Sequence, residues 1–287
     1  MIIVDLNQIV ISNLMGSLSE HSEDVNEELL RHMVLNSIRQ IRNQFVKEYG
    51  EMVIACDDRN YWRKKVFPYY KANRKKMRSK VNVNWNDFYE SFGKIREELK
   101  EIFPYPTIKI DSAEADDIIA VLCHEHGREL GGDPILIISA DKDFLQLQKY
   151  SNVKQYDPIR KRWLSTSDPK SFLIEHILKG DTGDGIPNFL SADDTFVAGG
   201  RQKQLRSKVI HEVLSSDWPE DWSGITSETL RNYNRNRMLI DLSCVPNEIQ
   251  EEVKRVYEEQ QGKSRGKLFN YFIKNKLKNL MENLSEF

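Results

Sequence analysis

The sequence lacks three features that would each indicate a particular class of protein. Its three cysteines, Cys56, Cys123 and Cys244, are far apart and odd in number, which argues against a disulfide framework and a cysteine zinc site. No apolar run approaches the roughly 20 residues of a membrane span. No basic segment of a secretory signal precedes the first apolar run. We therefore expect a monomeric protein of the reducing cytoplasm, without membrane contact.

No internal repeat or low-complexity linker divides the 287 residues, of which 39% are apolar and 30% charged. That balance is ordinary for a globular chain with a sizeable core. The formal net charge of -2 hides a strong segregation of acids and bases. Short apolar runs alternate with helical stretches, which predicts an α/β fold with a mostly parallel central sheet flanked by helices. We expect an α/β domain over residues 1–165 and a helical part over residues 166–287.

Hydrophobic periodicity places the individual elements. Strands are expected at 2–4, 52–56, 107–110 and 135–140, with another edge strand at 153–156. Helices are expected at 25–48, 86–102, 113–129, 168–179, 201–215, 226–240, 247–260 and 265–284.

Aspartates follow three of the apolar runs. Asp5 ends the first run, Asp57 follows the second, and Asp141 follows the run that begins at Ile135, with Asp143 two residues further on. The carboxyl ends of parallel strands meet at one edge of an open sheet, where ligands bind. These aspartates are therefore expected to line one negative pocket.

Two further acidic clusters are candidates for the same pocket. Glu114, Asp116 and Asp117 open a predicted helix, and Asp181 and Asp184 lie in the glycine-rich stretch GDTGDGIP. Each cluster also has a structural interpretation. Acids in a first helical turn are favoured by the helix dipole, and acids in a turn are commonly solvated.

Nine converging carboxylates would have to take up protons or bind cations. Two like charges 4 Å apart repel by about 4 kcal/mol at an effective dielectric constant of 20. No histidine lies in the acidic motifs, which disfavours zinc, whereas oxygen ligands favour Mg²⁺, with Mn²⁺ as a substitute. The pattern predicts two Mg²⁺ ions and phosphodiester hydrolysis, in which one ion activates a water and the other stabilises the leaving oxygen.

A basic segment follows directly after the second strand-end aspartate. Residues 59–80 hold ten Lys or Arg and five aromatic residues among 22, and no acid. An ordinary solvated helix would mix charges of both signs, and Pro68 argues against one unbroken helix. Cations beside aromatic rings suit single-stranded nucleic acid. The candidate phosphate contacts are Arg59, Arg63, Lys64, Lys65, Lys75, Lys76, Arg78 and Lys80.

Six motifs, in this order, resemble those of the flap endonuclease and 5′-nuclease family. They are VDLN with Asp5, ACDD with Asp57, YYKANR at 69–74, EADD at 114–117, SADKDFLQL at 139–147 and GDTGDGIP at 180–187. Stretches such as YWRKKVFPYYKANR and RGKLFNYFIK are similar to the ribonuclease H branch found in T-even bacteriophages. The resemblance thereby extends over nearly the full length.

This resemblance implies a 5′→3′ exonuclease and flap endonuclease with ribonuclease H activity, which removes RNA primers and trims 5′ ends of DNA duplexes during replication. It implies a PIN-like 5′-nuclease core with a basic arch at about 59–85, and a C-terminal part that completes the metal site and contacts duplex. All nine carboxylates would bind metal. Lys71 and Arg74 would contact the scissile phosphate region, and Tyr70 would lie near the arch base.

The same resemblance implies RNA/DNA hybrids and 5′-flap or forked DNA as substrates. A single-stranded-DNA-binding protein and a sliding clamp of a phage replisome are the expected protein partners, in the cytoplasm of an infected bacterial cell.

One region departs from the family. After Pro187 the chain lacks the compact glycine pattern of a duplex-binding helix-hairpin-helix. Arg201, Lys203, Arg206 and Lys208 are candidate replacements, or an ordinary basic helix face.

Three other functions remain open at this point. A nucleic-acid-binding replication accessory would keep the fold without catalysis, although the complete set of nine acids weighs against it. A phosphatase with a nucleophilic aspartate would need a second acid two residues after Asp5, where the sequence has Asn7. A primase or topoisomerase metal fold would account for Asp141 and Asp143 but would leave Asp5, Asp57 and the basic segment unexplained.

Overall fold

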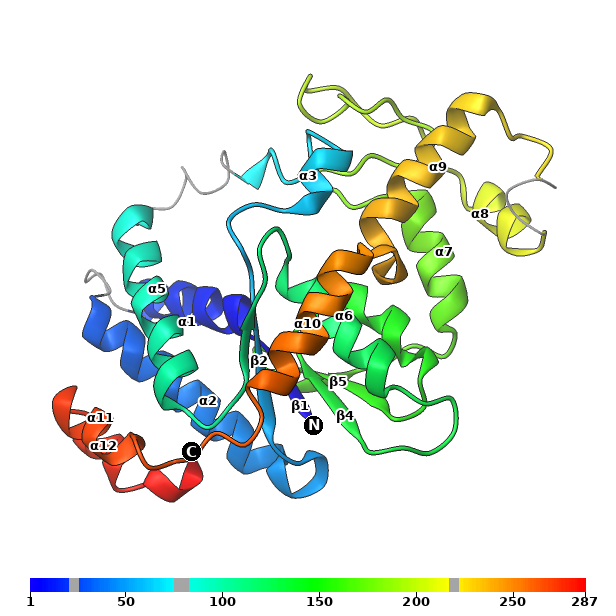
Figure 1. Cartoon of the computed structure of the whole chain (residues 1–287). Helices are drawn as coiled ribbons and strands as arrows, with labels where there is room; N and C mark the ends of the chain where they lie inside the picture. Colours follow the sequence, from blue (N-terminus) through cyan, green and yellow to red (C-terminus); the bar gives the residue numbers. More distant parts are fainter. Residues whose placement is uncertain (21–25, 75–82, 217–221) are drawn as a thin grey trace. The chain divides into compact units, whose positions relative to one another are not determined.

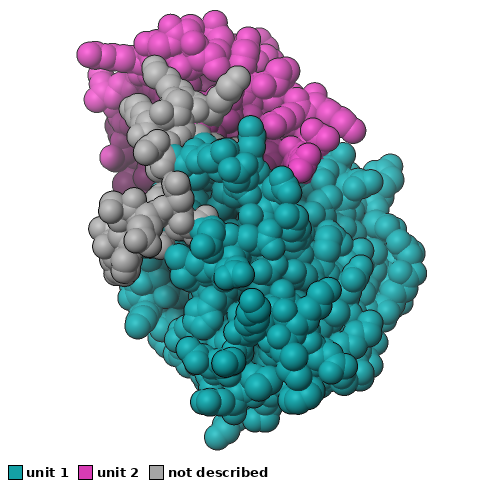
Figure 2. Space-filling model, turned by 90° about the vertical axis from the view of Figure 1, so that its left-hand side faces the viewer, with its two compact units in different colours: residues 1–58, 83–165, 246–287 teal, residues 59–82, 166–245 magenta. Residues whose placement is uncertain are grey.

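The computed structural model describes residues 1–20, 26–74, 83–216 and 222–287. Contacts divide the chain into two compact units, drawn in different colours in Figure 2. Unit 1 comprises residues 1–58, 83–165 and 246–287, and unit 2 comprises residues 59–82 and 166–245. Among the described residues, no helix combines the length and the apolar character needed to span a membrane.

Six strands of the described chain form the central sheet of unit 1 (Figure 1). They are β1 (Ile2–Asp5), β2 (Met52–Cys56), β3 (Thr107–Lys109), β4 (Ile135–Ile138), β5 (Val153–Asp157) and β6 (Arg162–Leu164). Their order is β3-β2-β1-β4-β5-β6, and every neighbouring pair is parallel except β5 and β6. The predicted fold class is therefore confirmed, and β1, β2 and β4 end at the same edge of the sheet.

Helices cover both faces of this sheet, which explains the nearly continuous apolar runs of its strands. Successive side chains of a strand face opposite sides. Ile2 and Val4 share a core cluster with residues of α1 (Leu6–Glu20), α2 (Glu27–Tyr49) and α5 (Trp85–Ile102). The helices α6 (Ala115–His126) and α10 (Asn247–Glu259) lie together on the other side (Figure 1).

The C-terminal residues pack on the sheet of unit 1. Gln260 forms two hydrogen bonds with the backbone of Thr107 on the edge strand β3, at 2.9 and 3.0 Å. Beyond it, α11 (Leu268–Lys274) buries Leu268 and Phe272 in the core, and α12 (Lys278–Met281) and η3 (Leu284–Glu286) follow. The observed units thus differ from the predicted division at residue 165, because residues 246–287 join unit 1 and residues 59–82 join unit 2.

Unit 2 has a separate apolar core. Its described residues form the helices α3 (Trp62–Val66), α7 (Pro169–Lys179), α8 (Ser207–Leu214), α9 (Ser227–Ile240) and the short η2 (Leu242–Cys244). Phe67 and Tyr70 belong to the same cluster as Ile186 and Leu239. The start of the basic segment is therefore built into the core that also holds the loop after α7.

Most predicted elements occur, and the exceptions have physical causes. Residues 201–206 are not helical, because the loop at 188–191 binds their polar groups: Asn188 Nδ2 donates to the Lys203 carbonyl at 2.8 Å. The helix expected at 265–284 is broken, with Lys276 at a φ of 56°. The strand at 153–156 is not at an edge, since β6 pairs with it. The first helix, α1, was not predicted, although its buried positions Leu6, Ile9, Val10 and Leu14 have helical spacing.

Candidate active site

Asp5 lies at the carboxyl end of β1, where α1 begins. Its Oδ1 accepts a hydrogen bond from the Gln8 backbone N–H at 3.1 Å, so the carboxylate caps the helix. Its Oδ2 accepts a hydrogen bond from the Ser139 hydroxyl at 3.2 Å. The side chain is 7% exposed. The strand-to-helix junction therefore holds a nearly buried carboxylate in one orientation.

Asp57 follows β2 and is fixed by two neutral donors. Asn7 Nδ2 donates to its Oδ2 at 2.8 Å, and the Ala115 backbone N–H donates to its Oδ1 at 2.7 Å. Ala115 is the first residue of α6, so this carboxylate also lies at the amino end of a helix, where the dipole favours negative charge. The next residue, Asp58, is different, because Lys109 Nζ lies 2.6 Å from its Oδ1.

Asp141 and Asp143 follow β4 and are linked to Asp5 through Ser139. The Ser139 hydroxyl accepts a hydrogen bond from the Asp141 N–H at 3.2 Å, and Asp141 Oδ1 accepts one from the Asp143 N–H at 3.0 Å. The buried Gln155 of β5 donates to the Asp141 carbonyl at 2.5 Å. A fully buried hydroxyl thus connects the ends of two neighbouring parallel strands.

The N-cap residue and the first turn of α6 add three acids at this edge. Glu114 and Asp117 form a reciprocal cap, in which Asp117 Oδ2 accepts a hydrogen bond from the Glu114 N–H at 2.9 Å. Both side chains are buried, whereas Asp116 between them is half-buried. The structure therefore brings seven of the nine predicted carboxylates to the carboxyl edge of the sheet in unit 1, and the hydrogen bond from Ala115 joins two of the groups directly.

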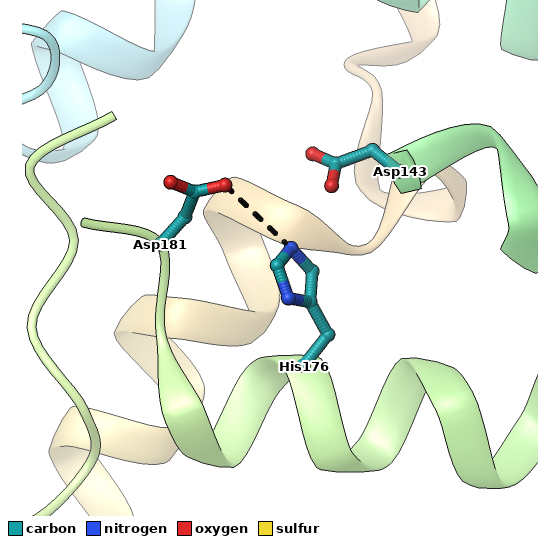
Figure 3. Close-up of side chains that lie close together, drawn as sticks. All are labelled: Asp143, His176 and Asp181. Atoms are coloured by element: carbon teal, nitrogen blue, oxygen red, sulfur yellow. Dashed lines mark ion pairs between the residues drawn. The ribbon is translucent and has the colours of Figure 1, made fainter. Parts of the chain in front are cut away.

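Asp181 and Asp184 belong to the loop after α7 in unit 2. Asp181 Oδ1 accepts a hydrogen bond from the Asp184 N–H at 3.1 Å. His176, on the last turn of α7, points toward Asp181 in Figure 3, with Nε2 3.8 Å from Oδ2. Histidine was not predicted in these motifs, because His176 lies five residues before Asp181 and outside the GDTGDGIP stretch.

Asp184 contacts three side chains of the YYKANR motif. Arg74 Nη2 lies 2.5 Å from its Oδ1, and the Tyr70 hydroxyl donates to its Oδ2 at 3.0 Å. Lys71 Nζ lies 3.5 Å from Oδ2. Burial alone would raise the pKa of Asp184, but Lys71, Arg74 and the Tyr70 hydroxyl outweigh it and hold the pKa below its usual 3.8. The sequence did not indicate that these two motifs meet.

The interior of unit 2 corrects two predictions about the basic segment. Arg63 is 2% exposed, and its Nε donates to the Leu239 carbonyl at 2.9 Å, so it holds the segment to α9 instead of facing phosphate. The rings of Trp62, Phe67 and Tyr70 are also buried, so in this fold they pack in the protein and do not stack on bases. The Tyr70 hydroxyl reaches Asp184 from this buried ring, so the described role of its polar end is a hydrogen bond to the acidic loop.

The remaining candidate cations are mostly accessible. Arg59, Lys64 and Lys65 are exposed, as are Arg201, Lys203, Arg206 and Lys208. Two of these form long ion pairs at the surface, Lys203 with Glu228 at 3.9 Å and Lys208 with Glu212 at 3.7 Å. Lys75, Lys76, Arg78 and Lys80 lie outside the described residues.

The burial of Arg63 leads to a stability prediction. Arg63→Ala removes the donor to the Leu239 carbonyl and should destabilise the protein by about 1–3 kcal/mol, the cost of an unsatisfied buried acceptor. Thermal unfolding measures this loss. Arg59→Ala is the matched control, because Arg59 is exposed, and its thermal stability should be unchanged. The logarithm of its binding constant for nucleic acid should fall less steeply with the logarithm of salt concentration, by a slope of about one. Wild-type stability of Arg63→Ala would contradict the structural assignment.

Sequence patterns missed the neutral residues that orient the acids. Asn7 lies two residues after Asp5 and binds Asp57, and Ser139 lies two residues before Asp141 and binds Asp5. Both positions were visible as polar residues beside strand-end aspartates. Their partners come from other strands, however, and only the order of the strands in the sheet identifies them.

Comparisons with known proteins agree with this geometry. Residues 2–175 match the family model described as the 5′-3′ exonuclease, N-terminal resolvase-like domain, and residues 169–287 match the T4 RNase H, C-terminal model. The chain is 33% identical to ribonuclease H of Enterobacteria phage T4 over 99% of this chain and 95% of that protein. It is 31% identical to the flap endonuclease Xni of Shewanella sp. (strain MR-4), over 47% of this chain and 50% of that protein.

A solved structure of the T5 5′-exonuclease shares the fold, with a TM-score of 0.60 and 18% identity over 91% of this chain and 99% of that one. The strand-end acids, the two matching family models and the relative of nearly equal length lead to the same assignment. The chain belongs to the 5′-3′ exonuclease family and is a nuclease, a metal-dependent phosphodiesterase.

Proposed function

We propose that this nuclease is a Mg²⁺-dependent 5′→3′ exonuclease and flap endonuclease that removes RNA primers from RNA/DNA hybrids and trims 5′ ends of DNA duplexes. The observation that carries the proposal is the row of oriented carboxylates at the carboxyl edge of the sheet in unit 1. The full-length relative from phage T4 is named a ribonuclease H, and the shorter relative from Shewanella a flap endonuclease, which supports both substrate classes.

The residues at this edge suit a hard divalent cation. Asp5, Asp57, Glu114, Asp117 and Asp141 offer carboxylate oxygens, the ligands that Mg²⁺ and Mn²⁺ prefer. The hydrogen-bond donors described above for Asp5 and Asp57 are neutral groups, which orient a carboxylate without cancelling its charge. Asp116 and Asp143 complete the proposed set in unit 1. The chemistry that bound cations supply to phosphodiester hydrolysis is activation of a water and stabilisation of the leaving oxygen.

The proposed roles of the other two acids rest on the family motif. In the GDTGDGIP stretch, Asp181 and Asp184 match positions at which the family binds metal. Related solved structures are titled as T5 enzymes with divalent metal ions, in one case zinc and in another together with DNA. The neighbouring His176 places an imidazole nitrogen 3.8 Å from an oxygen of Asp181, a donor that suits zinc better than Mg²⁺.

Lys71 and Arg74 are the proposed contacts for phosphate oxygens near the scissile bond. Their cationic groups lie together, because both face one carboxylate of Asp184. A pair of cations held in place can stabilise negative charge that develops on a phosphate. The exposed Arg59, Lys64 and Lys65 would bind the backbone of the strand without reading its sequence.

The proposed partners are RNA/DNA hybrids and flap or forked DNA, with Arg201, Lys203, Arg206 and Lys208 as contacts for duplex. A single-stranded-DNA-binding protein and a sliding clamp are the proposed protein partners, on the ground of the phage relative alone. By the same resemblance, the enzyme would act in the cytoplasm of an infected bacterial cell.

Cleavage of 5′-labelled substrates tests the proposal. A 5′-labelled RNA/DNA hybrid and a 5′-flap DNA are incubated with enzyme and Mg²⁺, and the labelled products are sized. We expect short products from the 5′ end of the RNA strand and release of the flap near its junction. Tight binding of both substrates without cleavage would support the non-catalytic accessory instead. If the flap DNA is cleaved but the RNA/DNA hybrid stays intact, the enzyme does not remove RNA primers.

A further inference from the structure

Both carboxylate oxygens of Asp184 contact side chains of the basic segment. Oδ1 lies 2.5 Å from Arg74 Nη2, and Oδ2 lies 3.0 Å from the Tyr70 hydroxyl and 3.5 Å from Lys71 Nζ. A divalent cation on this carboxylate would lie beside two positive charges and would be repelled by them. The immediate surroundings of Asp184 therefore resemble a cation-positioning site more than a metal site.

Backbone contacts hold the same two segments together. The Lys71 N–H donates to the Asp184 carbonyl at 2.7 Å, and Asn73 Nδ2 donates to the Thr182 carbonyl at 3.0 Å. Gly185 has a φ of +75°, and a Cβ at this position would lie 3.2 Å from the Tyr69 carbonyl oxygen. The glycine permits both the turn and the close approach. The loop that carries Asp184 is thus fixed along its length to residues 69–74.

Lys71 is held in an uncommon conformation at this contact. Its φ is 58°, in the left-handed region that a lysine rarely adopts. Its ammonium group lies 5.3 Å from the ring centre of Tyr61 and 4.9 Å from that of Tyr70, in addition to the Asp184 carboxylate. Strained backbone of this kind persists where surrounding contacts over-determine it and is common at functional sites.

Asp181, three residues earlier in the same loop, has different surroundings. Its Oδ1 accepts the Asp184 N–H, and its Oδ2 faces His176. A nitrogen beside a carboxylate is a donor that a divalent metal can use, whereas two cations beside a carboxylate weaken its attraction for a metal ion. The contacts described for the two aspartates of the motif therefore differ, although the sequence pattern treats the two residues alike.

We propose that Asp184 is a positioning residue, which holds Lys71 and Arg74 for the phosphate of the substrate, and that it is not a ligand of the divalent metal. This inference rests on the proposed function, in which those two cations contact phosphate. It changes the role of one of the nine predicted carboxylates. The negative charge of Asp184 then holds the two cations in position, and removal of that charge should leave the affinity for the metal unchanged.

The test compares Asp184→Asn with Asp181→Asn in single-turnover cleavage of a 5′-flap DNA over a range of Mg²⁺ concentrations. We expect Asp184→Asn to slow cleavage by about 10- to 100-fold, as for residues that orient catalytic groups, with the Mg²⁺ concentration for half-maximal rate unchanged. Added to a Lys71→Ala, Arg74→Ala background, it should cause no further slowing, since the groups it positions are gone.

Binding of Mn²⁺, measured by electron paramagnetic resonance without substrate, gives a readout independent of activity. Asp184→Asn should bind as the wild type does. Tyr70→Phe, which removes one hydroxyl only, should slow cleavage less than Asp184→Asn and serves if Asp184→Asn does not fold. Weakened Mn²⁺ binding by Asp184→Asn, or equal slowing with and without Lys71 and Arg74, would overturn the inference. A wild-type protein that cleaves no substrate would instead overturn the proposed function.

Discussion

Asp141→Asn should slow hydrolysis by about 10²- to 10³-fold, the range seen when one preorganised electrostatic contact is removed from an active site. Asparagine keeps the shape of the side chain and removes its charge. The acceptor for the Asp143 N–H therefore remains, and so does the link from the Asp141 N–H to Ser139. Binding of a 5′-tailed duplex should be largely unchanged, because the proposed phosphate contacts lie on other residues.

Asp133→Asn is a matched control for this variant. Asp133 is an exposed residue just before β4, at the opposite end of the strand that Asp141 follows. The same change of charge should leave the rate of cleavage at the wild-type value. Single-turnover rates with Mg²⁺ and equilibrium binding are measured for both variants. Near-normal turnover by Asp141→Asn would show that the acidic edge of unit 1 is not the catalytic site.

Lys71→Ala should have the second large effect, a loss of about 10²-fold in the cleavage rate of a 5′-tailed duplex. The Lys71 ammonium lies beside Asp184 and two tyrosine rings, and only 9% of the side chain is exposed. A preorganised charge of this kind contributes more to a transition state than a mobile surface lysine does. Arg74→Ala should act in the same direction, since Arg74 shares the carboxylate.

Lys170→Ala tests whether any loss of positive charge in unit 2 has the same effect. Lys170 is exposed in the first turn of α7, and no role in substrate binding is proposed for it. Rates and thermal unfolding are compared for the two variants. We expect Lys170→Ala to be as active as the wild type. Equal activity of Lys71→Ala on the tailed duplex would refute the proposed phosphate contact.

The acidic edge was predictable from sequence because few physical rules determine it. Short apolar runs between helices predict buried parallel strands, and parallel strands end at one edge. Asp5, Asp57 and Asp141 therefore lie at the same edge of the sheet, as expected. The helix-start acids follow as well, since Glu114 and Asp117 cap α6.

The functions of the basic segment were less predictable, because sequence does not show which residues a second core will bury. The basic, aromatic-rich segment predicted Arg63 and Phe67 as contacts for nucleic acid, but both side chains lie in the interior of unit 2. Their partners come from α9, more than 160 residues later in the chain. A long separation in sequence also hid the contact between Lys71 and Asp184, which lie 113 residues apart in the chain (184 − 71).

Local sequence patterns also could not predict the boundary between the units. A division at residue 165 separates mixed strands and helices from helices alone. Gln260, however, binds the edge strand β3, and Phe272 enters the core that contains Ile2. Long-range packing of this kind assigns the last 42 residues to unit 1, by the count from 246 to 287.

The decisive measurement is cleavage of a 5′-labelled flap DNA by metal-stripped enzyme. EDTA is added first, the products are sized, and excess Mg²⁺ is then added to the same sample. If the carboxylates at the sheet edge hold the catalytic cations, no product forms in EDTA and 5′-end cleavage appears when Mg²⁺ is restored. Cleavage that continues at the same rate in EDTA would contradict a metal-dependent mechanism at this edge.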